Sequence, residues 1–274
     1  MQRIGIGRTA ELLEMGDGKV LKLFYKNMSS EMAEKEYKIN MYINGKIENI
    51  PQIYGKIDVD GREGLVFQKI DGIHLSRYMS RNITKIPNVL KKYSELHCKI
   101  NQIEVDTGNK DIGGINGIIE AIKNQKCLNE LEKGTIISFL RITDKKQLCH
   151  GDYHPENVMI DRDNKLWIID WITASAGNPN FDIARTYYLL RYGQSPEKRS
   201  FFIKIIEKLL KVYLGKQYLK YRVNKKEKDS FMCYFYIILI LRRNDNIQEE
   251  HNRLEKLIRK NSKRANDKMR ELLN

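Results

Sequence analysis

The chain has 274 residues, of which 41% are hydrophobic, and its 49 Lys and Arg against 35 Asp and Glu give a formal net charge of +14. This length suits a large core or two lobes. The sequence shows no apolar run of the roughly 20 residues that span a membrane and no signal-peptide pattern. We therefore expect a cytoplasmic protein without a membrane partner. The excess charge lies after Gly177, where 23 Lys and Arg face 11 Asp and Glu. No base-stacking or groove-reading motif accompanies it, so nucleic acid is an unlikely partner, and a solvated surface is favoured over a specific anionic partner.

The first 24 residues alternate turn-like and strand-like runs. Gly5 and Gly7 form a G-x-G pattern that is followed by Thr9, and the runs Glu11–Met15 and Val20–Phe24 are typical of strands. Gly-rich loops suit phosphate binding because bare backbone lets N–H groups approach closely. A glycine-rich hairpin turn explains the same pattern, so the motif alone decides nothing.

Lys22 lies inside the apolar run V-L-K-L-F and needs an anionic partner, because an isolated buried ammonium is very costly. The next segment, Ser29–Asn44, carries apolar residues at helical spacing behind a serine cap. Glu36 falls among its apolar positions, so we predict that Glu36 pairs with Lys22. Glu31 and Glu34 are alternative partners, because sequence alone does not fix which face of the helix meets the strand.

Two further strand-like runs, Pro51–Lys56 and Gly64–Ile70, complete a β-rich N-terminal part. Beyond Gly72 the pattern is helical, with predicted helices at Asn88–Ile103, Gly117–Gln125, Leu128–Ile142, Phe201–Leu214 and Asp229–Leu241. The last two are strongly apolar and should form a core. From Arg242 onward charges alternate in sign among sparse apolar residues, which predicts a surface helix or a pair of helices.

The most informative stretch is L-C-H-G-D-Y-H-P-E-N-V-M-I-D-R-D-N-K-L-W-I-I-D-W, residues 148–171. Apolar runs at Val158–Ile160 and Leu166–Ile169 flank the turn-rich D-R-D-N, which predicts a β-hairpin. A hairpin brings its ends together, so Asn157 and Asp170 should emerge side by side. Their amide and carboxylate oxygens are hard ligands suited to Mg²⁺, which takes its other ligands from water and phosphates. Asp152 lies five residues before Asn157, and its expected task is to accept a proton.

His150-Gly151-Asp152, then Asn157, then the hairpin and Asp170 resemble the catalytic loop and metal-binding Asp of kinases. H-G-D, and D-W in place of D-F-G, are more similar to the aminoglycoside phosphotransferase and choline kinase family than to protein kinases. G-N-P-N-F-D-I-A resembles that family's G-D-P-x-x-D-x-A, with Asn178 in place of the usual Asp. Twelve positions separate Asp170 from Asp182, too few for the activation segment of a protein kinase.

The resemblance implies a bilobal, protein kinase-like α+β fold. A small β-rich lobe with one helix would span residues 1–70, and a larger, mostly helical lobe would span residues 71–274. The catalytic residue would be Asp152, which orients and deprotonates the acceptor hydroxyl, and Asn157 and Asp170 would hold Mg²⁺ on the phosphates. His150 and Asp182 would support the catalytic loop, and Asp182 would also cap the helix that follows it.

The resemblance also implies a nucleotide site, for ATP or GTP. Lys22 would bind the α- and β-phosphates and Glu36 would hold it in place. The loop with Gly5, Gly7 and Thr9 would cover the phosphates, and the backbone from Gln68 to Ile70 would meet the base.

The expected function is transfer of the γ-phosphoryl group of ATP to a hydroxyl of a small molecule. Aminoglycosides, choline, sugars, amino-acid hydroxyls and lipid head groups remain open as acceptors, although the basic C-terminal part weighs mildly against a polycation. The alternatives are a nucleotide-binding regulator with a degraded site and a protein kinase. Lys22, Asp152, Asn157 and Asp170 are all present, which disfavours the regulator.

Overall fold

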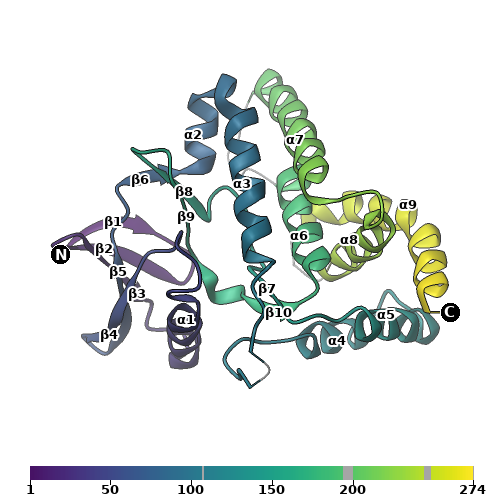
Figure 1. Cartoon of the computed structure of the whole chain (residues 1–274), viewed down its shortest axis with the longest axis horizontal. Helices are drawn as coiled ribbons and strands as arrows, with labels where there is room; N and C mark the ends of the chain where they lie inside the picture. Colours follow the sequence, from purple (N-terminus) through teal and green to yellow (C-terminus); the bar gives the residue numbers. More distant parts are fainter. Residues whose placement is uncertain (107, 194–199, 244–247, 274) are drawn as a thin grey trace. The chain divides into compact units, whose positions relative to one another are not determined.

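The computed structural model of the protein describes all residues except 107, 194–199, 244–247 and 274 (Figure 1). An antiparallel β-sheet dominates the N-terminal part and helices dominate the C-terminal part, so the mixed α+β class is as predicted. The chain divides into two compact units. Unit 1 contains Met1–Ile86 and His154–Ala174, and unit 2 contains Pro87–Tyr153 and Ser175–Asn274.

Unit 1 is built on a five-stranded antiparallel sheet in the order β1 (Gln2–Ile6), β2 (Ala10–Gly16), β3 (Lys19–Phe24), β5 (Arg62–Gln68) and β4 (Ile53–Val59). Side chains alternate between the faces of a strand. Leu21 and Leu23 therefore pack on one face with Val66, whereas Phe24 packs on the other face with Ala33 of the helix α1 (Ser30–Ile43). Lys22 shares the strand face of Phe24, the face that α1 covers.

A second, three-stranded sheet in unit 1 joins segments far apart in the sequence. β6 (Gly72–His74) pairs with β8 (Val158–Asp161), which pairs with β9 (Leu166–Ile168). The short helix α2 (Leu75–Arg81) and the 3-10 turns η1 (Ile83–Lys85) and η2 (Trp171–Thr173) complete the unit. Because β6 pairs with β8, the compact units interleave along the chain, whereas the predicted lobes are two continuous segments.

Unit 2 is mainly helical, with α3 (Ile86–Ile100), α4 (Asn116–Lys123), α5 (Glu130–Ile142), α6 (Pro179–Tyr192), α7 (Phe201–Arg222), α8 (Lys228–Arg242) and α9 (Gln248–Leu273). A two-stranded sheet pairs β7 (Gln147–Cys149) with β10 (Ser175–Gly177). The helix α8 contacts both α6 and α9 (Figure 1). Nearly all residues of its middle turns are buried, as predicted.

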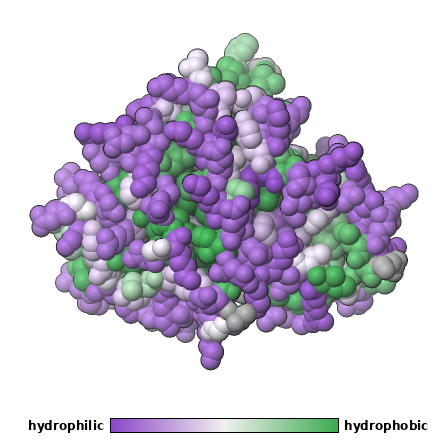
Figure 2. Space-filling view, in the orientation of Figure 1, coloured by the Kyte–Doolittle hydropathy of each residue, from purple (hydrophilic) through white to green (hydrophobic). Residues whose placement is uncertain are grey.

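The prediction of a surface helix near the C-terminus is confirmed: α9 is one helix, anchored on α8 and α5 by the fully buried Leu254, Ala265 and Met269. The prediction that Phe201–Leu214 joins the core is wrong for the first turns of α7, where Phe202 is 76% exposed and Leu209 is 65% exposed. α7 packs closely on α6 at Gly215, where an added Cβ would meet Tyr187 and Arg191. Apolar side chains of its first turns stay exposed, at the top of Figure 2. Within the described residues, no helix has the length and hydrophobicity to cross a bilayer.

Candidate active site

A partly buried ion-pair cluster surrounds Lys22 in unit 1. The Lys22 Nζ donates to both carboxylate oxygens of Glu36, at 2.7 and 2.8 Å, and to Oδ1 of Asp170 at 3.1 Å. The predicted pairing of Lys22 with Glu36 is therefore confirmed. Glu34, one of the alternative partners, instead pairs with Lys56. The reason is helical register, since Glu36 belongs to the buried stripe of α1.

The cluster keeps the ammonium group of Lys22 charged. Burial alone would lower the pKa of Lys22, but the negative charges of Glu36 and Asp170 outweigh it and raise this pKa above its ordinary value. Burial raises the pKa of the Glu36 carboxyl, and the charge of Lys22 opposes that shift. Lys22 therefore remains positively charged on the face of the sheet that α1 covers.

The predicted hairpin is present, with its two ends adjacent. The N–H of Ile169 donates to the carbonyl oxygen of Asn157 at 3.0 Å, which places Asn157 beside the segment that leads into Asp170. In the loop, the carboxylate of Asp161 accepts from the backbone N–H groups of Asp163 and Lys165 and from Nε1 of Trp167. The local sequence thus closes the hairpin and fixes where its ends emerge.

Asp170 has a left-handed backbone with φ of 63°, which costs a non-glycine residue roughly 1 kcal/mol or more. Its side chain is 41% exposed and still reaches Lys22. Asn157 is mostly buried and supplies an amide oxygen at the adjoining hairpin end. Two hard oxygen donors match the chemistry of Mg²⁺, which commonly takes its other ligands from water and phosphates. The described residues hold no cluster of three or more His, Cys, Asp or Glu side chains that suits a metal.

The loop that carries Asp152 is held by a buried carboxylate in unit 2. Asp182 of α6 accepts from the backbone N–H groups of His150 at 2.8 Å and Gly151 at 2.9 Å. Gly151 has φ of 79°, so the glycine in H-G-D meets a backbone requirement. The bracing contact predicted for Asp182 is present. Its predicted capping role is wrong, because Asn178 caps α6 by accepting from the N–H of Asn180.

Asp182 stays ionised although it is fully buried. Burial alone would raise its pKa, but His97, His150 and the N–H of Gly151 outweigh burial and hold the pKa of Asp182 well below its usual range. Burial lowers the pKa of His97 even though Asp182 acts in the opposite direction. The neutral His97 ring can donate from Nε2 to Asp182 at 2.8 Å while its Nδ1 accepts from the hydroxyl of Tyr218 at 2.6 Å.

Sequence reasoning assigned no role to the partners behind this carboxylate. Asn101 donates to Asp182 at 3.1 Å, and Arg222 of α7 donates to Asn101 at 2.6 Å. Tyr153 stacks on Tyr93 at 4.4 Å between ring centroids, and each hydroxyl donates to the other residue's carbonyl oxygen. The one available signal was the presence of polar residues, His97 and Asn101, on the apolar stripe of a predicted helix.

Asp152 itself is partly accessible. Its side chain is 29% exposed, and Oδ1 accepts from Nη2 of Arg185 on α6 at 3.3 Å. The N–H of Asp152 donates to Nδ1 of His150 at 3.2 Å, which orients the backbone at the predicted catalytic residue. Arg185 was not identified from the sequence. The Asp152 carboxylate can therefore accept a proton, with its backbone held by His150 and its side chain hydrogen-bonded to Arg185.

The other predicted nucleotide-binding residues lie in strands and turns of unit 1. Gly5 sits opposite Leu12 in the first strand pair, and the N–H of Gly7 donates to the carbonyl oxygen of Ala10 at 2.8 Å. The G-x-G therefore spans the end of β1 and the start of the turn to β2, and in that turn the carbonyl oxygen of Thr9 accepts from the N–H of Tyr25. After Gln68 the chain leaves β5, and the carbonyl oxygen of Ile70 accepts from the N–H of Gly72. The nucleotide roles of these residues stay predictions.

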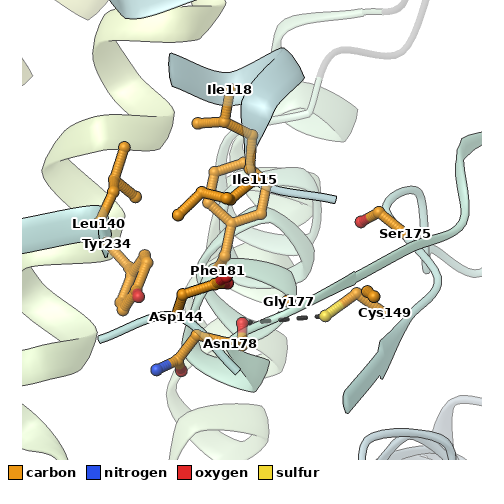
Figure 3. Close-up of a pocket in the computed structure, with 11 residues that line it drawn as sticks. Ile115, Ile118, Leu140, Asp144, Cys149, Ser175, Gly177, Asn178, Phe181 and Tyr234 are labelled. Carbon is orange, nitrogen blue, oxygen red and sulfur yellow. Dashed lines mark hydrogen bonds between the residues drawn. The ribbon is translucent and has the colours of Figure 1, made fainter. Parts of the chain in front are cut away.

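Cys149 is buried beside a very small cavity in unit 2, shown in Figure 3. Its thiol donates to the carbonyl oxygen of Asn178 at 3.8 Å, and burial raises the pKa of the thiol well above its ordinary value. The cavity of about 20 Å³ has room for roughly one water molecule. Cys149 is therefore a packing residue.

Solved structures similar to this chain include several kinases of small molecules. They include the ADP-bound aminoglycoside phosphotransferase APH(2'')-Ib, with 17% identity, a TM-score of 0.55 and coverage of 96% of this chain and 91% of that one. The choline kinase LicA from Streptococcus pneumoniae has 15% identity and a TM-score of 0.54, with coverage of 95% of this chain and 90% of that one. An ethanolamine kinase of Plasmodium vivax has 14% identity and a TM-score of 0.55, with coverage of 88% of this chain and 72% of that one. At such identities the likeness shows the fold, and it confirms the predicted kinase-like fold.

Sequence comparison identifies the family. A search of curated proteins found no significant match to this chain. Residues 12–207, well over half of the chain, match the pattern that defines the phosphotransferase enzyme family. This match covers Lys22, Glu36 and the stretch from His150 to Asp182. The chain therefore belongs to the phosphotransferase enzyme family.

Proposed function

We propose that this protein transfers the γ-phosphoryl group of ATP to a hydroxyl group of a small molecule, with Mg²⁺ as cofactor. The observation that carries the proposal is the cluster of Lys22, Glu36 and Asp170 in unit 1. A buried lysine held by a helix glutamate and next to a second carboxylate is the arrangement that positions nucleotide phosphates in kinase-like proteins. The ADP in a similar solved phosphotransferase adds support for the nucleotide.

The predicted site residues of unit 1 each take a defined role in this proposal. Lys22 binds the α- and β-phosphates, and Glu36 keeps its ammonium group in place. Asn157 and Asp170 hold Mg²⁺, which when bound neutralises charge on the phosphates. The loop of Gly5, Gly7 and Thr9 covers the phosphates, and the backbone from Gln68 to Ile70 meets the base.

Asp152 is the proposed proton acceptor. Its carboxylate accepts a hydrogen bond from the acceptor hydroxyl and takes the proton as the hydroxyl oxygen bonds to the γ-phosphorus. The bond from that phosphorus to the β–γ bridging oxygen breaks, and ADP leaves with the electron pair. Arg185 orients the carboxylate, and Asp182 with His150 fixes the loop.

A small acceptor is favoured over a protein substrate. Between Asp170 and the start of α6 at Pro179 the chain forms only η2 and β10, so the segment that holds a peptide in protein kinases has no counterpart. The similar structures act on aminoglycosides, choline and ethanolamine by their names, so they agree on a small hydroxylated acceptor and differ in its identity.

The test is transfer of phosphate from Mg²⁺-ATP across a panel of hydroxylated small molecules. Asp152→Asn should lower kcat by about 10²- to 10⁴-fold, the usual contribution of general base catalysis, while the Kd of ATP changes less than about twofold. Asp163→Asn, on the exposed hairpin loop, is the matched control and should keep full turnover. Undiminished kcat in Asp152→Asn would refute the assignment of the base.

A further inference from the structure

A cavity of about 350 Å³ lies in unit 2 among α4, α6 and α8. Its size falls in the range of small-molecule sites, which is about 300 to 1,000 Å³. Ile118, Ile238 and Leu241 give it an apolar wall, and Gln125, Arg185 and Arg242 supply its polar groups. None of the described residues that line it is an Asp or a Glu, so its lining carries two formal positive charges.

The two guanidinium groups are held in place by other contacts. Arg242 lies over the ring of Tyr188, with 5.4 Å from its guanidinium carbon to the ring centroid. Arg185 is anchored by Asp152 through Nη2, and its buried Nε has no hydrogen-bond acceptor among the described residues. A buried N–H of a charged group without an acceptor is unfavourable, so Asp152 alone does not satisfy the guanidinium group of Arg185. The Arg185 side chain is 29% exposed and lines the cavity, where an anionic group of a ligand would meet its charge.

We propose that the phosphate acceptor is a hydroxylated small molecule that carries a carboxylate or phosphate group, bound by Arg185 and Arg242. This inference rests on the proposed function. Guanidinium groups match carboxylate and phosphate oxygens in geometry as well as in charge. Because Arg185 touches both the cavity and Asp152, an anion bound there brings a nearby hydroxyl of the same molecule to the proposed base. A cationic acceptor would instead meet two positive charges.

The experiment measures kcat and KM with Mg²⁺-ATP for four classes of hydroxylated compound: hydroxycarboxylates, sugar phosphates, neutral sugars and polyols, and the cations choline and an aminoglycoside. Turnover should be confined to the first two classes, and the contrast between them separates carboxylate from phosphate. Arg242→Gln should raise KM for that acceptor about 10- to 100-fold, with kcat within about threefold and KM for ATP unchanged. Arg242→Lys should recover part of the loss.

Arg141→Gln, on the exposed face of α5, is the control and should match the unaltered protein in all constants. Turnover confined to neutral or cationic acceptors, or an unchanged KM in Arg242→Gln, would overturn this inference and leave the kinase function standing. If no compound is phosphorylated, calorimetric titration of the ATP-bound protein with inorganic phosphate decides. About tenfold weaker binding to Arg242→Gln supports the anion site, and equal binding rejects it. Failure of the proposed function shows separately, as turnover retained by Asp152→Asn.

Discussion

Asp182→Asn should destabilise unit 2, because the buried carboxylate accepts four hydrogen bonds at once. Three donors converge on Oδ2, from His97, Asn101 and the N–H of His150, and the N–H of Gly151 points at Oδ1. An asparagine can keep its oxygen where the three donors meet. Its amide nitrogen then faces the Gly151 N–H, and two donors confront each other.

The cost follows from this geometry. A hydrogen bond to a charged acceptor contributes about 1.5 to 3 kcal/mol, and a buried donor left unpaired costs about 1 to 3 kcal/mol. The three remaining hydrogen bonds also lose their ionic character. We therefore expect the free energy of unfolding of unit 2 to fall by about 2 to 4 kcal/mol.

Urea unfolding followed by circular dichroism at 222 nm is the suitable assay, because the helices lie mainly in unit 2. Tryptophan fluorescence would report on the wrong unit, since Trp167 and Trp171 are both in unit 1. Asp229→Asn, an exposed ion-pair partner in the first turn of α8, should cost less than about 1 kcal/mol. A change below about 0.5 kcal/mol in Asp182→Asn would refute the reasoning.

Three further outcomes are expected. Folding lowers the pKa values of both His97 and Asp182, so their contributions to stability are complete above pH about 6.5. As the pH falls, the contribution of His97 is lost first, and that of Asp182 is lost below pH about 4. Urea midpoints from pH 8 to 4 should show the loss through His97, and midpoints from pH 4 to 2 the further loss through Asp182, each at most about 1.4 kcal/mol per pH unit; a flat profile would contradict it. Glu36→Gln should raise KM for ATP roughly tenfold, as measured by initial rates, because the lysine loses a charged partner; an unchanged KM would remove Glu36 from the nucleotide site. Gly72→Ala should destabilise unit 1 by about 2 kcal/mol or more, since the new Cβ would lie 2.5 Å from a strand carbonyl oxygen. Gly134→Ala has open space in α5 and should stabilise unit 2 by about 0.5 to 1 kcal/mol. Thermal unfolding that shifts stability in the same direction for both variants would contradict this.

Features set by residues close in sequence were predictable. Alternation along β3 and helical spacing in α1 place Lys22 and Glu36 on facing surfaces, and the pairing followed from that periodicity. The hairpin between Asn157 and Asp170 followed from two apolar runs around a turn-rich tetrapeptide. In both cases one short segment contains all the information that the geometry requires.

Features that join distant segments were not predictable. The pairing of β6 with β8 brings together segments more than 80 residues apart, and nothing in G-I-H indicates its partner strand. Arg185 looked like any polar residue of an amphipathic helix until α6 placed it against Asp152. The packing of α9 against α8 and α5 depends on the surfaces that those helices leave open to it, which the sparse apolar residues of α9 do not reveal.

The stacked pair of Tyr93 and Tyr153 bears on how the protein is made. Its two hydrogen bonds join residues 60 positions apart, Asp182 reaches His97 across 85 positions, and Tyr218 reaches His97 across 121. Contacts of such long sequence separation form late, because the chain between them must close first. During synthesis, the loop of Asp152 therefore acquires its last supports only after α7 has left the ribosome, and a nascent chain that stops before Tyr218 would hold an aspartate without its scaffold.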